Sequence, residues 1–299
     1  MDAKLQRWVQ RHGWDRAVHH YHDSWGDQLR PAHEAVLTLA ALEPGESVVE
    51  VGCGTGLVTL PAAAAVGASG RVVATDISGQ MVGETARRAR ECGCSQVETL
   101  RCDAEALGAA LGARPPFDVA ICSLGLMYVP VPGVATAEMA AALRPGGRLV
   151  AAVWGERRNC GWASIFPIVE RRVESDVCPL FFALGAPGSL AALVAQAGFV
   201  DVDEHRISCE LVYADEDAAL AAAFLGGPVA LAYSRFDADT RASAAADYLE
   251  SISPFRDGAR YRIPGEFVIV AARRPAADAD QAFAHTSNKQ QPQPEEQPT

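Results

Sequence analysis

The chain has 299 residues, of which 49% are hydrophobic and 21% charged, and its formal net charge at pH 7 is −11. This length can hold one large α/β domain or two small ones with a sizeable core. The negative charge argues against the broad basic surface that binds nucleic acid or an anionic membrane, and the sequence has no apolar run of the roughly 18 residues that would predict a membrane span.

The first residues of the chain lack the apolar core of a signal peptide, so we expect a cytoplasmic protein. The eight cysteines include no CxxC pair, and we interpret them as reduced thiols. Cys92 and Cys94 flank a glycine, a pattern that suits a helix end better than a metal or redox site. No metal site is predicted.

Residues 1–40 have helical character, with two segments separated near Gly13 and Gly26. The second would begin at Pro31, because proline suits the first turn of a helix. Between the two lies a polar stretch rich in aromatic side chains, with His19, His20, Tyr21, His22, Trp25 and Gln28. It precedes the first predicted strand and is free to fold over the sheet, so we predict an N-terminal helical lid over residues 1–43.

From residue 44 the pattern changes to an alternation of strands and helices. Strands are predicted over 47–51, 71–75, 97–101, 117–122 and 147–153, with helices over 57–66, 79–92, 103–111 and 134–143. Such an alternation with short connections predicts a parallel sheet covered by helices on both faces.

The pattern after residue 155 is less regular. Helices are predicted over 162–175 and 190–197, an alternating strand over 199–207, an Ala-rich helical insertion over 215–252 and a final strand over 267–272. From residue 275 the composition shifts to Ala, Asp, Gln, Pro and Glu, which predicts a disordered tail over 275–299.

A glycine-rich turn follows the first strand, with Gly52, Gly54 and Gly56 at alternate positions. Glycines let the backbone turn sharply and approach a ligand closely, and the next helix directs its free N–H groups into the turn. A dinucleotide fingerprint would need a third glycine where Leu57 stands. A phosphate loop would need a lysine, which is absent from this turn. The turn therefore indicates a nucleotide-type ligand without a pyrophosphate.

Four stretches resemble, in order and spacing, motifs of the class I S-adenosylmethionine-dependent methyltransferases. They are residues 50–56 (EVGCGTG), 72–78 (VVATDIS), 102–107 (CDAEAL) and 143–149 (LRPGGRL). The chain is most similar to the small-molecule group that includes the ubiquinone and menaquinone C-methyltransferases. The resemblance implies a doubly wound, Rossmann-like sheet of seven mostly parallel strands with the last strand antiparallel. It also implies a cofactor-binding core over 44–155, and a substrate cap with the final strands of the same domain over 156–274.

The resemblance further implies S-adenosyl-L-methionine as cofactor and a role for each matching residue. Asp76 would bind the ribose hydroxyls, Asp103 the adenine amine, and Glu50 the ammonium group indirectly. The full implied set is Glu50, Gly52, Cys53, Gly54, Gly56, Asp76, Ile77, Met81, Asp103, Ala104 and Ser123. For Asp76 and Asp103 the alternative is an N-cap role, since both precede predicted helices.

Methyl transfer by in-line displacement demands chiefly alignment and exclusion of water. The candidate catalytic residues are Tyr21, His20 and Tyr128. In related enzymes an N-terminal tyrosine lies near the sulfonium, which an aromatic face can stabilise. For each single histidine of the lid, a position on the helix surface is the simpler interpretation. Many relatives carry a histidine near the position of Tyr128, and here none is present.

A further group of candidate residues, for the acceptor site, follows the fifth strand. Aromatic side chains there suit an apolar, aromatic or quinone-like acceptor, and they equally suit packing of the cap onto the sheet. They are Trp154, Trp162, Phe166, Phe181 and Phe182, with Asn159 in the same segment.

The predicted function is transfer of a methyl group to O, N or C of a small molecule. The alternative is a cofactor-binding regulatory protein of the same fold without turnover. Leu57 argues against an oxidoreductase, and the cysteine spacing does not resemble that of arsenite methyltransferases. No nucleic acid is expected as a partner, and a monomer and a homodimer both stay open.

Overall fold

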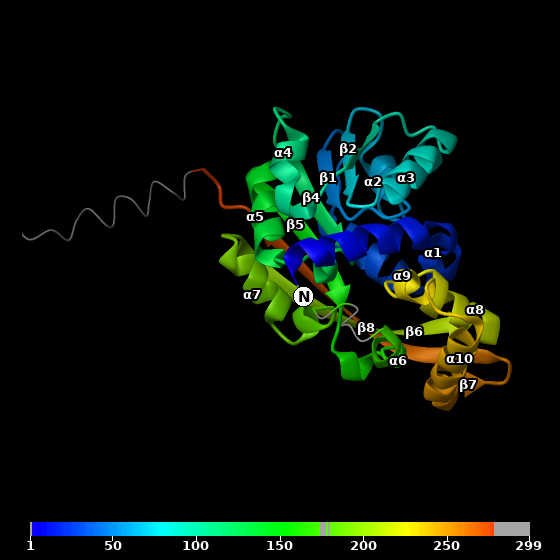
Figure 1. Cartoon of the computed structure of the whole chain (residues 1–299). Coiled ribbons are helices and arrows are strands. Elements are labelled where there is room, and N and C mark those ends of the chain that lie inside the picture. Colours follow the sequence, from blue (N-terminus) through cyan, green and yellow to red (C-terminus); the bar gives the residue numbers. More distant parts are fainter. Residues whose placement is uncertain (1, 174–177, 179, 278–299) are drawn as a thin grey trace, which may run out of the picture.

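A central β-sheet organises the computed structural model, which describes residues 2–173, 178 and 180–277 (Figure 1). The strands are β1 (Ser47–Val51), β2 (Arg71–Asp76), β3 (Val97–Arg101), β4 (Phe117–Ser123), β5 (Leu143–Trp154), β6 (Val200–Tyr213), β7 (Arg256–Asp257) and β8 (Arg260–Arg273). Seven lie in the order β3-β2-β1-β4-β5-β8-β6, and the short β7 pairs only with β8. Strands β1 to β5 pair in parallel, whereas β8 is antiparallel to both β5 and β6. The predicted mostly parallel sheet with an antiparallel last strand is confirmed.

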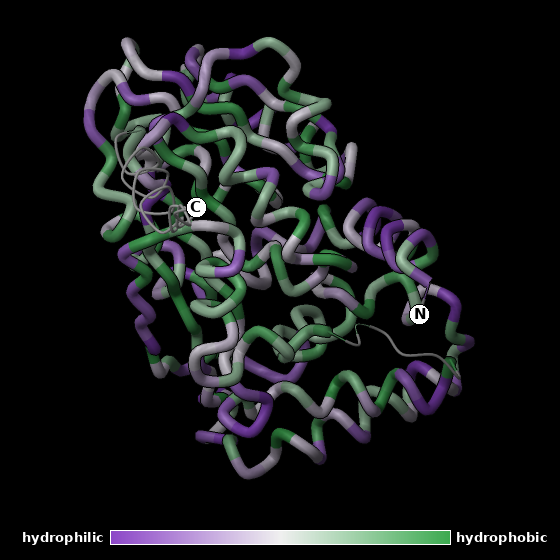
Figure 2. The backbone as a smooth tube through the Cα atoms, turned by 90° about the vertical axis from the view of Figure 1, so that its left-hand side faces the viewer, coloured by the Kyte–Doolittle hydropathy of each residue, from purple (hydrophilic) through white to green (hydrophobic). Residues whose placement is uncertain are grey.

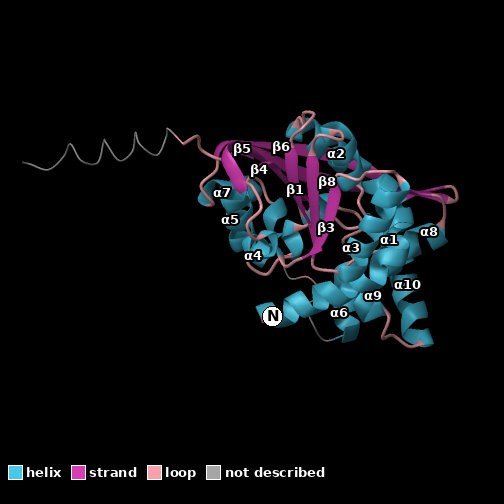
Figure 3. Cartoon of the chain, turned by 90° about the horizontal axis from the view of Figure 1, so that it is seen from above, coloured by secondary structure: helices cyan, strands magenta, loops and turns pink. Residues whose placement is uncertain are grey.

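Helices cover both faces of this sheet (Figure 3). They are α1 (Ala3–Ala40), α2 (Thr59–Val66), α3 (Gly79–Glu91), α4 (Leu107–Leu111), α5 (Pro132–Ala142), α6 (Ile165–Val173), α7 (Ser189–Gln196), α8 (Glu216–Leu220), α9 (Ala230–Tyr233) and α10 (Ala238–Ile252). Right-handed crossovers between parallel strands put α2 and α3 on one face, and α4, α5 and α7 on the other. Strands buried on both faces need apolar side chains throughout, and Val48 and Val49 are fully buried. Figure 2 shows hydrophilic residues gathered in the outer helices and turns.

Helix α1 is one continuous helix, so the prediction of two segments is wrong. Gly13 does not break it, because this glycine is where the helix meets α9: a Cβ here would lie 3.8 Å from Cβ of Leu231. Pro31 lies inside the helix rather than at a start. Buried residues recur along the whole length of α1, and this packing outweighs the roughly 1 kcal/mol that each glycine costs a helix.

The two connections late in the chain also carry helices. Helix α6 lies between β5 and α7, while α8, a π-helix (Ala221–Leu225), α9 and α10 lie between β6 and β7. Both α9 and the π-helix contact α1. Strands β6 and β8 run longer than predicted, because their antiparallel pairing continues to Tyr213 and Tyr261.

Two predictions extend beyond the described residues. The tail predicted over 275–299 lies outside them from residue 278, and the helix predicted over 162–175 lies outside them from residue 174. Among the helices that the structure describes, none combines the length and apolar composition that a membrane span requires.

Candidate active site

A cavity opens beneath α1 at the carboxyl ends of the parallel strands, where open α/β sheets bind ligands. It holds about 1030 Å³ of space between atoms, part of it open to solvent. One end is polar and formed by the glycine turn and strand ends. The other is lined by aromatic side chains. We call these the polar end and the aromatic end.

The glycine turn forms the floor of the polar end. Gly52, Gly54 and Gly56 have φ of +77°, +54° and +87°, in the left-handed region that favours glycine. A Cβ on Gly52 would lie 3.4 Å from Cα of Gly125, and one on Gly54 would lie 3.5 Å from Cε1 of Tyr21. The turn is therefore enclosed between α1 and the loop after β4, with its backbone facing the cavity.

Asp76 ends β2 and lines the cavity. Its Oδ2 accepts from the Gly54 N–H at 3.0 Å, and its Oδ1 accepts from the Ser78 N–H at 2.8 Å. Burial raises the pKa of this carboxyl to about 6. The N-cap of α3 is Ser78, whose Oγ accepts from the Met81 N–H at 3.1 Å. The N-cap alternative is thus wrong for Asp76.

Asp103 does act as an N-cap, and it lines the cavity as well. Its Oδ1 accepts from the Glu105 N–H at 3.0 Å, while its Oδ2 lies 2.9 Å from Nε of Arg7. Arg7 also pairs with the Glu105 carboxylate. An ion pair from α1 therefore covers this side of the polar end.

The remaining predicted cofactor residues divide into two groups. Ile77, Met81, Ala104 and Ser123 line the cavity together with the residues above. Ser123 is 9% exposed, and its Oγ has no hydrogen-bond partner among the residues that the structure describes. Leu124, which follows it, has φ of +60°. A strained residue beside an unpaired hydroxyl is typical of a functional site.

Glu50, Cys53 and Gly56 do not line the cavity. Glu50 is buried behind the turn, where its Oε2 accepts from Oγ1 of Thr59 at 2.5 Å and burial raises its pKa to about 8. The Cys53 thiol and Gly56 face Thr85 of α3. For Glu50 this position follows from its place in β1, because successive residues of a strand point to opposite sides.

Seven aromatic residues surround the rest of the cavity. Their consecutive ring centroids lie 5.6 Å (Tyr21–Trp14), 5.1 Å (Trp14–Tyr128), 5.4 Å (Tyr128–Phe181), 5.6 Å (Phe181–Trp162), 4.8 Å (Trp162–Trp154) and 6.1 Å (Trp154–Trp25) apart. Burial raises the pKa of Tyr21 and of Tyr128, so both hydroxyls stay neutral at pH 7. These side chains form an apolar chamber beside the glycine turn.

Two predicted aromatic residues lie behind this chamber. Phe166 and Phe182 do not line the cavity and pack against Phe181 and Trp162. Asn159 is also outside, where its Nδ2 donates to Oε2 of Glu266 at 3.1 Å. For the two phenylalanines the packing interpretation holds.

His20 is exposed and does not line the cavity, as is His19. Successive side chains of a helix are about 100° apart, so the inward direction of Tyr21 turns His20 away. The structure contradicts a catalytic role for His20.

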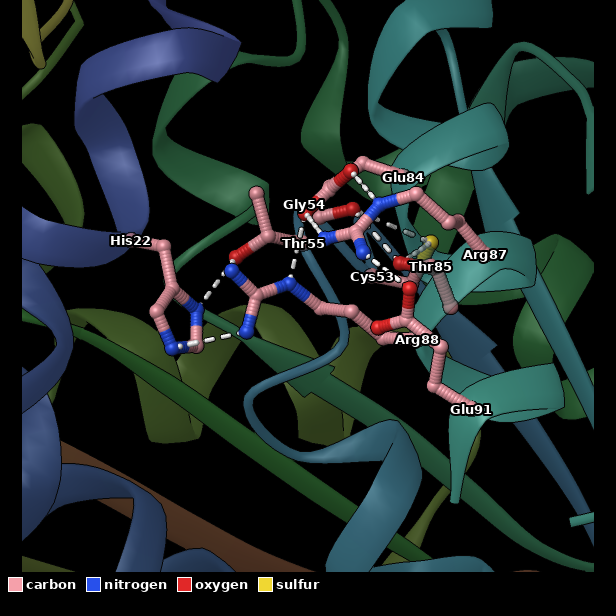
Figure 4. Close-up of polar contacts among 9 residues, drawn as sticks. All are labelled: His22, Cys53, Gly54, Thr55, Glu84, Thr85, Arg87, Arg88 and Glu91. Atoms are coloured by element: carbon pink, nitrogen blue, oxygen red, sulfur yellow. Dashed lines mark hydrogen bonds and ion pairs between the residues drawn. The ribbon is translucent and has the colours of Figure 1, made fainter. Parts of the chain in front are cut away.

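His22 docks α1 onto the outer side of the glycine turn (Figure 4). Its Nδ1 lies 3.3 Å from Oγ1 of Thr55, and its Nε2 lies 2.9 Å from Nη1 of Arg88. Burial and the charge of Arg88 lower the pKa of His22, so the neutral ring accepts from Arg88 and donates to Thr55. Behind the turn, Oγ1 of Thr85 donates to the Gly54 carbonyl at 2.8 Å.

Other contacts hold α1 in place along its length. The Asp15 carboxylate accepts from Oγ of Ser78 at 2.6 Å, and the Gln28 side chain pairs in both directions with the backbone of Val212 at 2.7 Å. The N–H of Trp25 donates to the Ala222 carbonyl at 3.2 Å. The predicted lid is thus a docked helix in this structure.

The sequence interpretation missed several residues that line the cavity. Arg7, Gln10 and Trp14 come from the first half of α1, and Gly227 and Pro228 from the link before α9. Gln10 and Trp14 lie four residues apart, and Tyr21 follows two turns after Trp14. This helical spacing was a usable signal. The link before α9 carries no comparable pattern.

Comparisons with known proteins agree with this geometry. Residues 48–147 match a family model described as a methyltransferase domain. The chain is 30% identical over 264 residues to nocamycin O-methyltransferase of Saccharothrix syringae, which covers 82% of this chain and 91% of that protein. It is 26% identical over 191 residues to a ubiquinone/menaquinone biosynthesis C-methyltransferase of Ectopseudomonas mendocina, which covers 59% of this chain and 73% of that protein.

Among solved structures, the chain is similar in fold to phosphoethanolamine N-methyltransferase 2 of Haemonchus contortus. The TM-score is 0.56 at 15% identity, over 87% of this chain and 57% of that one.

Proposed function

The chain belongs to the class I S-adenosylmethionine-dependent methyltransferases, and we propose that it transfers a methyl group to a small apolar acceptor bound in the aromatic end of the cavity. The observation that carries this proposal is the continuity of the cavity. One continuous space joins a polar end suited to the cofactor with an aromatic end suited to an acceptor.

The residues of the polar end fit S-adenosylmethionine. Asp76 has carboxylate oxygens at the strand end, where ribose hydroxyls could donate to them. The unpaired Oγ of Ser123 gives a second polar partner. Gly52 and Gly54 leave room for a ligand against the backbone, and Ile77 and Met81 supply apolar surface for a planar base. When bound, the cofactor supplies an electrophilic methyl group on a sulfonium.

The residues around the reacting centre act by position and environment. Tyr21 holds its ring over Gly54, and an aromatic face stabilises a nearby cation. Helix α1 covers the cavity and limits access of water, and correct alignment of two reactants supplies much of the acceleration. The neutral hydroxyls of Tyr21 and Tyr128 can donate hydrogen bonds and orient the acceptor.

The similarity to an O-methyltransferase over 91% of that protein's length favours oxygen as the methylated atom, over nitrogen or carbon. The aromatic lining favours an aromatic or quinone-like acceptor.

Calorimetric titration with S-adenosylmethionine, followed by a tritium-methyl transfer screen over phenols, hydroxyquinones and amines, tests the proposal. We expect cofactor binding and turnover on at least one hydroxylated aromatic compound. Binding without turnover on any acceptor would favour the regulatory alternative. Absence of cofactor binding would overturn the proposal.

A further inference from the structure

The indole nitrogen of Trp162 is a buried donor without a partner. Trp162 is 3% exposed and lines the aromatic end, and its Nε1 has no hydrogen-bond partner among the described residues. Leaving a buried N–H unpaired costs about 1–3 kcal/mol, and native proteins pair nearly all such groups. Because Trp162 lines the aromatic end, a ligand bound there is the available source of a partner for this donor.

Trp25 provides an internal comparison. It lines the same end, with its ring centroid 5.8 Å from that of Trp162. Its N–H, in contrast, donates to the Ala222 carbonyl at 3.2 Å. Within the described part of the chain, the donor of Trp25 therefore has a partner and that of the neighbouring Trp162 has none.

The surroundings of Trp162 define the chemistry of its missing partner. Its ring is contacted by Trp154 at 4.8 Å and Phe181 at 5.6 Å between centroids, so the walls are aromatic. An indole N–H can only donate. The partner must therefore be an acceptor atom on a molecule that is otherwise apolar and flat enough to lie among these rings.

We propose that Trp162 Nε1 recognises a carbonyl or enolate oxygen of a planar aromatic methyl acceptor and thereby fixes the orientation of that acceptor. The inference rests on the proposed function for the identity of the cavity. A site that donates to a ligand oxygen discriminates strongly against an analogue lacking it, because the donor is then left unpaired.

The test uses 9-fluorenone and fluorene, two planar tricyclic compounds that differ in one carbonyl oxygen. Binding is measured by calorimetry on the full chain, with and without saturating S-adenosylhomocysteine. We expect the wild type to bind 9-fluorenone about tenfold more tightly than fluorene. Trp162→Phe should remove this preference. Trp25→Phe, the matched control, also exchanges an indole for a phenyl ring and should keep it.

A second measurement does not depend on the stability of the variants. The five tryptophans give separate indole N–H signals in a ¹⁵N-correlated NMR spectrum. We expect 9-fluorenone to shift the Trp162 signal downfield and fluorene to leave it in place.

Equal affinity of the wild type for both probes, or a preference that survives in Trp162→Phe, would overturn the inference. A Trp162 signal that stays unshifted would place the N–H against an aromatic ring instead. Failure of both probes to bind would overturn the planar aromatic class. Failure to bind S-adenosylhomocysteine while the preference for 9-fluorenone persists would count against the proposed function alone.

Discussion

The two ends of the cavity are built in different ways. The polar end comes from residues at the ends of consecutive strands, and backbone hydrogen bonds such as Gly54 to Asp76 hold it. The aromatic end comes from α1, the loop after β4, the end of β5 with the segments that follow it, and the link before α9, and side-chain packing holds it. A site made of consecutive strand ends is specified by short local sequence motifs. A site made of distant segments exists only once the chain has folded.

This difference makes the two ends separable by substitution. Changes in the polar end should alter cofactor affinity, and changes facing the aromatic end should alter turnover. The predictions below test that separation.

The largest effect is expected for Asp76→Ala. Removing a charged acceptor should weaken S-adenosylmethionine binding by about 1–3 kcal/mol, or about 5- to 150-fold in Kd. Calorimetry measures this loss. Asp237→Ala, which removes an N-cap carboxylate bonded to the Thr240 N–H and outside the cavity lining, is the control and should leave Kd unchanged. Unaltered affinity of Asp76→Ala would remove the ribose assignment.

A smaller effect is expected for Gly52→Ala. Its φ is +77°, and the new Cβ would lie 3.4 Å from Cα of Gly125 at the cavity floor. Cofactor affinity should fall about tenfold, equivalent to about 1.4 kcal/mol.

Gly93→Ala is the matched control. Its φ is +69°, with nothing within 4 Å of the added Cβ. Both variants should lose about 1 kcal/mol of stability to left-handed strain, as measured by urea denaturation. Only Gly52→Ala should lose cofactor affinity, and equal affinities in the two variants would refute the close approach of ligand and backbone.

Tyr21→Phe should lower kcat about fivefold, because one hydrogen bond is worth about 1 kcal/mol, with cofactor Kd nearly unchanged. Steady-state kinetics on the acceptor found by the transfer screen measure this. Tyr248→Phe alters a tyrosine that is 2% exposed and does not line the cavity, and it should not change kcat. An unaltered kcat in Tyr21→Phe would mean that the Tyr21 hydroxyl does not contribute to turnover and that the residue serves in packing.

The smallest effect is expected for Glu50→Gln at pH 5. Burial raises the pKa of Glu50 from 4.5 to about 8, so at pH 5 the folded carboxyl is neutral and the unfolded one is only partly ionised, and the unfolding free energy should change by less than about 1 kcal/mol.

The difference in unfolding free energy between the wild type and Glu50→Gln should grow at higher pH. The folded wild type retains a proton that the unfolded chain releases near pH 4.5, so this contribution is complete below pH 4.5 and is lost as pH rises through about 8. Urea denaturation without cofactor from pH 5 to 9 should show the wild type falling relative to Glu50→Gln. Parallel pH profiles would mean that Glu50 is ionised at neutral pH.

The ease of predicting each end from the sequence follows the same division. The strands of the core and the cavity-facing positions of Gly52, Asp76 and Asp103 could be predicted, because a short motif determines both the turn and the residue at its end. Glu50, Cys53 and Gly56 belong to the same motif but point away from the cavity. A motif gives the backbone path and not the direction of every side chain.

From the sequence, the aromatic end could be predicted only as a segment rich in aromatic residues, without knowing which of them line the cavity. Phe181 lines the cavity and the adjacent Phe182 does not, and only tertiary packing decides between them. Treating α1 as two helices hid the register that brings Gln10 and Trp14 to the face of Tyr21. His20 had suitable chemistry, but its position on the helix turns it outward.

The continuity of α1 has a consequence for recombining this enzyme with its relatives. The helix is bonded to the glycine turn through His22, to the start of α3 through Asp15 and to β6 through Gln28. At Gly13 it packs against α9, where an added Cβ would lie 3.8 Å from Cβ of Leu231. A chimaera that imports only the insertion over 215–252 would place foreign residues against the native α1. The smallest unit to exchange for a change of acceptor choice is therefore that insertion together with α1.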